Sequence, residues 1–158
     1  MAMPDHVRRL RQQIGGDLLL MPSVSVLVRD GEGRLLLVRH SHSGSWGLIG
    51  GAVEVDERPE DAAVRETEEE TGLRVDLTGL IAALGGPKFR VRYPNGDETA
   101  YVSVVYEARV TGGTERPDGD ETIDLDWFRP EDLPTVHLGP FAEATFEELG
   151  WLGEPSPE

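Results

Sequence analysis

The stretch 59–72 constrains the fold more than any other part of the chain. Pro59 suits the first position of a helix, and the acidic residues Glu60 and Asp61 interact favourably with the helix dipole there. Gly72 supplies a C-terminal stop, because glycine readily adopts the left-handed conformation that ends many helices. These local signals predict one well-delimited helix over 59–71, with a glycine-rich segment before it.

The remaining segments are typical of short strands. Apolar and β-branched runs alternate with turn residues, and the pair Asn95-Gly96 is a strong hairpin signal. We also expect a short N-terminal helix over 5–14, capped by Asp5, and a C-terminal helix over 141–149. Strands are expected over 23–29, 34–39, 77–84, 89–93, 99–109 and 123–128, whereas 40–56 is expected to be mostly irregular and 153–158 a disordered tail. The pattern indicates an α+β or α/β fold.

Composition excludes several classes of protein. The 158 residues suit a single domain, and the absence of cysteine excludes disulfides, cysteine-ligated zinc, iron–sulfur clusters and a thiol nucleophile. Lys and Arg total 15 against 30 Asp and Glu, which gives a net charge of −15. We therefore expect no binding to nucleic acid by bulk electrostatics, although a cation could bridge the protein to a small anion. No apolar run approaches the roughly 18 residues of a membrane span, so we expect no membrane partner and a cytoplasmic location.

Three carboxylates gather on one face of the predicted central helix. At about 100° per residue, Glu69 and Glu70 fall within about 60° of Glu66. Like charges three or four residues apart destabilise a helix by about 0.2–0.5 kcal/mol per pair. A hard divalent cation such as Mg²⁺ would compensate, because it prefers carboxylate oxygens and keeps waters or phosphate oxygens as further ligands. A solvated acidic surface is the alternative interpretation of these three residues alone.

A longer motif favours the cation. The segment 51–73 contains Gly51, then five residues, Glu57, then seven residues and the run Arg65-Glu66-Thr67-Glu68-Glu69-Glu70-Thr71-Gly72-Leu73. This segment resembles the box of the Nudix hydrolase family, which includes MutT-like proteins. The preceding segment 46–54 is similar to the family's lead-in. Three departures occur: Thr67 at a position that is usually apolar, Ile49 in place of the usual proline, and Val55-Asp56 in place of the common turn before Glu57.

The resemblance implies an α/β/α sandwich with a mixed β-sheet between helices, as a single Nudix domain over 1–158 with its box at 51–73. It also implies Mg²⁺, with Mn²⁺ as a substitute, held against a diphosphate. The implied ligands are Glu66, Glu69, Glu70 and the carbonyl of Gly50, with a later loop residue, Glu121 or secondarily Asp120. The implied catalytic residues are Glu66 as general base and Arg65 and Glu57, which would lock the helix to the loop. A loop glutamate, Glu98 or Glu121, is the alternative base.

Substrate contacts are predicted from position and side-chain chemistry. Arg39 and His42 flank the glycine-rich segment and could reach phosphates or the distal group of the substrate, and Phe89 and Tyr93 could stack on a base. For two further aromatic candidates, Trp46 and Tyr101, a core position is favoured. The histidines His6, His40 and His137 lack metal-ligand spacing and are given no role.

Three functions remain open at this point. The first is Mg²⁺-dependent hydrolysis of the diphosphate linkage in a nucleoside diphosphate joined to another moiety, such as ADP-ribose or a dinucleotide. The second is a nucleoside triphosphate pyrophosphohydrolase that clears oxidised nucleotides. The third is a non-catalytic nucleotide-sensing module, against which the three retained glutamates argue. The expected partner is a small-molecule nucleotide, and a homodimer is a candidate assembly.

Overall fold

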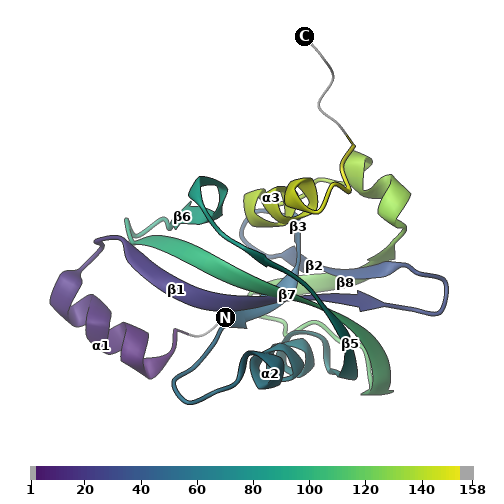
Figure 1. The fold of residues 1–158 in the computed structure, drawn as a ribbon, viewed down its shortest axis with the longest axis horizontal. Helices are drawn as coiled ribbons and strands as arrows, with labels where there is room; N and C mark the ends of the chain where they lie inside the picture. Colours follow the sequence, from purple (N-terminus) through teal and green to yellow (C-terminus); the bar gives the residue numbers. More distant parts are fainter. Residues whose placement is uncertain (1–2, 154–158) are drawn as a thin grey trace, which may run out of the picture.

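One mixed sheet runs through the molecule, with helices on both of its faces (Figure 1). The computed structural model describes residues 3–153, and eight strands of this part of the chain belong to the sheet. Its main path is β3 (Trp46–Gly47), β2 (Leu35–His40), β1 (Leu19–Arg29), β7 (Glu98–Gly113) and β5 (Leu73–Leu84). In addition, β4 (Ile49–Ala52) pairs with β1, β6 (Arg90–Arg92) with β7, and β8 (Thr122–Phe128) with β2. The strands β1 and β7 run parallel, whereas the other pairs are antiparallel.

The helices cover the two faces of the sheet. Figure 1 shows α2 (Pro59–Thr71) on one face and α3 (Pro140–Glu148) on the other. Alternation along a strand sends successive side chains to opposite faces. Val26 of β1 accordingly packs with Ala62 and Ala63 of α2, while Leu27 packs with Phe146 of α3. This arrangement confirms the predicted α/β/α sandwich with a mixed sheet.

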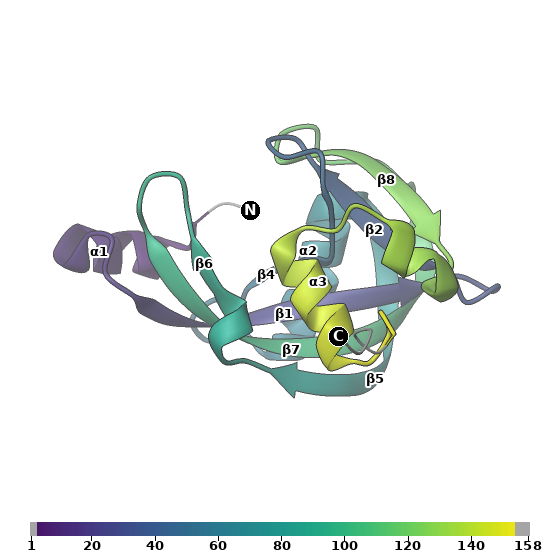
Figure 2. The ribbon, with the colours of Figure 1, turned by 90° about the horizontal axis from the view of Figure 1, so that it is seen from above.

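The third helix, α1 (Asp5–Ile14), stands at one end of the sheet beside β6 (Figure 2). Its predicted bounds are confirmed, but the predicted cap is wrong. Pro4 occupies the cap position and makes no side-chain cap bond, whereas Asp5 is already helical and pairs with Arg8 at 2.7 Å. Two short 3-10 turns complete the fold, η1 (Pro87–Phe89) and η2 (Pro130–Thr135). The described helices include none that is long and apolar enough to cross a membrane.

The central helix has the predicted bounds because its signals are local. Pro59 stands in the first turn, and Gly72 ends the helix with a φ of 74°. Thr67, the residue in the usually apolar position, is fully buried. Its hydroxyl donates to the Ala63 carbonyl at 2.8 Å, so burial leaves no unsatisfied donor. The departure from the motif is therefore accommodated within the helix itself.

Several strands differ from their predicted bounds, and each difference follows from pairing with a distant segment. The segment 40–56 is mostly irregular, as predicted, but it also contains the short strands β3 and β4, and β4 pairs with β1 from Ile49↔Val26 to Ala52↔Ser23. The strand β5 begins directly after the helix stop rather than at residue 77, since Leu73 pairs with Gly113. That pairing also extends β7 to Gly113, beyond its predicted end at residue 109. Of the predicted tail, residues 154–158 lie outside the described residues.

Candidate active site

Of the three glutamates of α2 predicted as metal ligands, two point inward and one outward. Glu66 is 3% exposed and sits beside the fully buried Ala62 and Ala63. Glu70 lines the main cavity, and its Oε2 accepts a hydrogen bond from the Gly50 backbone N–H at 3.0 Å. The side chain of Glu69 is 58% exposed. The predicted acidic face is therefore divided, with Glu66 and Glu70 turned toward the sheet.

Arg65 joins these carboxylates to the loop before the helix. Its Nε and Nη2 donate to the two oxygens of Glu57 at 2.7 and 2.8 Å, and its Nη2 also donates to the Ala52 carbonyl at 3.2 Å. Its Nη1 reaches Glu66 at 3.0 Å and Glu69 at 3.3 Å. The bidentate pair with Arg65 lowers the pKa of Glu57. One guanidinium thus orients the loop and partly neutralises the acidic helix.

Burial changes the proton affinity of the inward glutamates. It raises the pKa of Glu66 to about 7, although the adjacent Arg65 acts in the opposite direction. Burial and the charge of Glu66 raise the pKa of Glu70 well above its usual value, against the Gly50 N–H bond, which lowers it. Two carboxylates on successive turns therefore share a site where negative charge is poorly compensated by the protein.

This donor set fits a hard divalent cation. Within residues 3–153, no group of three or more Asp, Glu or His side chains is arranged so that these side chains alone could hold a metal ion. Mg²⁺ does not require one, because it commonly uses one or two carboxylates and completes its shell with waters and substrate phosphates. The carboxylates of Glu66 and Glu70 face inward and repel each other, and Glu70 contacts the glycine backbone of β4. This arrangement favours a bound cation over the alternative of a solvated acidic surface.

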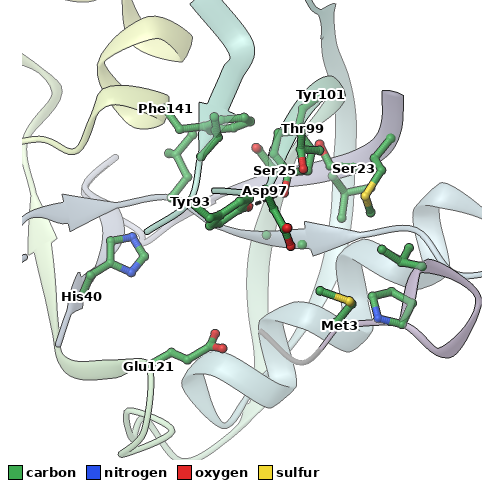
Figure 3. A pocket seen from close by; sticks show the side chains of 18 of the residues that line it. Met3, Ser23, Ser25, His40, Tyr93, Asp97, Thr99, Tyr101, Glu121 and Phe141 are labelled. Carbon is green, nitrogen blue, oxygen red and sulfur yellow. Dashed lines mark hydrogen bonds between the residues drawn. The ribbon is translucent and has the colours of Figure 1, made fainter. Parts of the chain in front are cut away.

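A cavity of about 720 Å³ opens beside Glu70. Figure 3 shows His40 and Glu121 on one side of it and Met3 on the other. The polar part of its lining includes Gly50, Gly51, Glu70, His40, His42 and Glu121. The apolar and aromatic part includes Met3, Val7, Met21, Tyr93, Tyr101 and Phe141. A cavity lined by both carboxylates and aromatic rings can bind a molecule that carries phosphates and a ring.

The predicted substrate residues divide into two that line the cavity and two that do not. His42 and Tyr93 line it. The prediction for Phe89 is wrong, because this residue is fully buried and packs edge-on against Phe141 at a centroid distance of 5.3 Å. Arg39 does not line the cavity, and its guanidinium lies over the Trp46 ring, 5.9 Å from the centroid, so its contact with a substrate stays a prediction.

The remaining candidates are placed as follows. Glu121 lines the cavity, and its backbone carbonyl accepts from the Ser41 N–H at 2.9 Å. Asp120 also contacts this turn, through a carbonyl that accepts from the Ser41 hydroxyl at 2.9 Å. Glu98 does not line the cavity and lies 3.9 Å from Arg90. Tyr101 is buried at 8% exposure, as expected for a core residue, although its side chain also reaches the cavity.

Sequence reasoning missed His40, which lines the cavity. Strand alternation carried the signal, because His40 follows Leu36 and Val38 on the side of β2 that faces α2. Burial and the neighbouring His42 lower the pKa of His40, so its imidazole is neutral at neutral pH. Gly47 gives the ring its space, since a Cβ there would lie 2.3 Å from the His40 Nε2.

Comparisons with known proteins identify the family of this chain. A model of the NUDIX domain matches residues 19–151. The chain is 35% identical over 108 residues to a MutT-like protein of Streptomyces ambofaciens. The matched region is 68% of this chain and 62% of that protein, so the chain spans less than two thirds of the relative's length. It is 33% identical over 123 residues to an ADP-ribose pyrophosphatase of Methanocaldococcus jannaschii, covering 75% of this chain and 69% of that protein.

A solved structure has a similar fold. The crystal structure of a MutT NUDIX hydrolase from Burkholderia pseudomallei matches with a TM-score of 0.68 at 28% identity, over 83% of this chain and 98% of that one. The family model spans most of the described residues, from β1 to the end of α3, and includes the glutamates of α2. The chain therefore belongs to the Nudix family.

Proposed function

We propose that this protein is a hydrolase of phosphoric anhydride bonds that cleaves the diphosphate linkage of a nucleoside diphosphate joined to another moiety, such as ADP-ribose or a dinucleotide. The observation that supports this most is the cavity of about 720 Å³, whose lining includes Glu70 together with Tyr93 and Tyr101. Its volume suits a ligand of that size. The relative from Methanocaldococcus jannaschii is named as an ADP-ribose pyrophosphatase.

In this proposal Mg²⁺, with Mn²⁺ as a substitute, would be held by Glu66, Glu69, Glu70 and the carbonyl of Gly50, with Glu121 from the later loop. When bound, such an ion neutralises the diphosphate and makes hydroxide available near neutral pH. Glu66 accepts a proton from the attacking water as the general base. Arg65 and Glu57 hold the helix and the loop in register, and His42 and Tyr93 contact the substrate.

The deciding test is product identification after incubation with ADP-ribose, NAD⁺, a dinucleoside polyphosphate and nucleoside triphosphates, each with Mg²⁺ and with EDTA. We expect a monophosphate plus a phosphorylated group from a linked nucleoside diphosphate, and no turnover in EDTA. A monophosphate plus pyrophosphate from the triphosphates alone would identify the second function instead. Tight binding without turnover of any compound would identify a sensing module.

The metal-free protein is expected to lose stability as the pH rises. The folded protein holds the Glu66 proton more tightly than the unfolded chain does, because its pKa is raised from 4.5 to about 7. The stabilising contribution of this group is therefore complete below about pH 4.5 and is lost as the pH rises through about 7. We expect the melting temperature in EDTA to be lower at about pH 8 than at about pH 5, and Mg²⁺ to raise it mainly at the higher pH.

The matched variant is Glu66→Gln, which cannot ionise and should show a flatter profile over the same range. An unchanged profile in this variant would assign the pH dependence to other groups.

The cytoplasmic location, the homodimer and a single domain over 1–158 stay predictions.

A further inference from the structure

The N-terminal helix contributes to the cavity through one heavily engaged side chain. Arg11 of α1 is 10% exposed. Its Nη1 donates to the carbonyls of Gly15 and Asp17 at 3.0 and 2.6 Å. Its Nη2 donates to the Glu98 carbonyl at 2.8 Å and to the Thr99 hydroxyl at 3.1 Å. One guanidinium thereby joins the end of α1 to the start of β7, two segments far apart in the sequence.

The second segment includes the turn that lines the cavity. Asp97 Oδ2 lies 3.7 Å from Arg11 Nε and accepts from the Asn95 amide at 3.1 Å. The Asp97 carbonyl accepts from the Tyr93 N–H at 2.8 Å, and the Tyr93 hydroxyl is hydrogen-bonded to that of Tyr101. Contacts thus run without interruption from α1 through the turn to the tyrosine pair.

Both joined segments face the same space. Met3, Val7 and Arg11 line the cavity from the N-terminal side, and Tyr93 and Asp97 line it from the turn (Figure 3). Figure 2 shows α1 and β6 at the same end of the sheet. In Figure 3, Met3 lies across the cavity from His40 and Glu121. Its apolar and aromatic lining, with the polar Asn95 and Asp97 at its edge, suits a flat ring that carries hydrogen-bonding groups.

We propose that Arg11 is a positioning residue for substrate recognition: it fastens α1 to the turn 93–97, so that together they form the wall that receives the nucleobase. This inference rests on the proposed function, because it assigns the cavity's second end to the group on the far side of the diphosphate. Arginine is required by geometry, since its planar fork reaches acceptors on both segments, whereas the single ammonium of lysine cannot.

Two non-hydrolysable ligands separate the ends of the cavity. The α,β-methylene analogue of ADP-ribose reaches both ends, whereas methylenediphosphonate carries the diphosphate mimic without a base. Binding of each, with Mg²⁺, is measured by calorimetry for the wild type, R11A and R11K. We expect R11A to bind the nucleotide analogue at least about tenfold more weakly and methylenediphosphonate unchanged, with R11K between R11A and the wild type. With ADP-ribose as substrate, KM should rise while kcat stays close to that of the wild type.

The matched control is R9A on the same helix. Arg9 is exposed and does not line the cavity, so both affinities should equal those of the wild type. Equal losses of both ligands in R11A, or no loss of either, overturn the inference, and D97N repeats the test should R11A fail to fold. If the wild type binds neither ligand, the proposed function fails. If it binds both ligands equally tightly, only the base-binding wall fails.

Discussion

Glu70→Gln is expected to lower turnover by about a hundredfold or more, because it removes a carboxylate proposed to hold the metal, and loss of one group that supports transition-state charge stabilisation commonly costs about 10²–10³ in rate. The Glu70 carboxylate lines the cavity and accepts the Gly50 N–H at 3.0 Å. Glutamine keeps the size and one carbonyl acceptor but removes the charge. The loss should therefore appear in kcat and in the Mg²⁺ concentration required for activity, both measured by steady-state kinetics.

The same substitution should not unfold the protein. Burial raises the pKa of Glu70 well above its usual value, so the ionised side chain destabilises the metal-free fold at neutral pH. The melting temperature of Glu70→Gln in EDTA is expected to equal or exceed that of the wild type. Glu68→Gln is the matched control, because Glu68 is on the same helix but exposed. Full activity in Glu70→Gln, or an equal loss in Glu68→Gln, would contradict the site.

Gly50→Ala is expected to abolish activity and to destabilise the fold. A Cβ at this position would lie 2.1 Å from the Val24 carbonyl oxygen and 3.1 Å from the Val24 carbonyl carbon. Both are backbone atoms of β1, so neither can rotate away as a side chain would. The strand β4 must shift from β1, which displaces the Gly50 N–H from Glu70. Overpacking of this kind costs about 1–3 kcal/mol, to be measured by denaturant unfolding together with turnover.

Gly79→Ala is the control for this experiment. Gly79 lies within β5, and a Cβ there would meet nothing within 4 Å. We expect unchanged turnover and unfolding free energy close to that of the wild type. If Gly50→Ala behaved like Gly79→Ala, the close contact between β4 and β1 would not be what positions the glycine backbone beside Glu70.

The sequence by itself determined the parts of the protein that depend on neighbours along the chain. The bounds of α2 follow from Pro59 and Gly72, and the spacing from Gly51 to Leu73 identified the family before any fold was known. Helical periodicity also brought Glu66, Glu69 and Glu70 to one side, since residues three and four apart share a helix face. These inferences require no knowledge of distant residues.

Only the tertiary structure decided which of these side chains are buried and what surrounds them. Packing of α2 on the sheet turned Glu66 and Glu70 inward, left Glu69 half exposed and enclosed Phe89 against Phe141. The bond from Arg11 to Glu98 spans 87 residues and has no periodic signal in the sequence. Burial and cross-strand contacts depend on pairing between segments that are far apart in the sequence. Local sequence patterns do not predict which segments will pair.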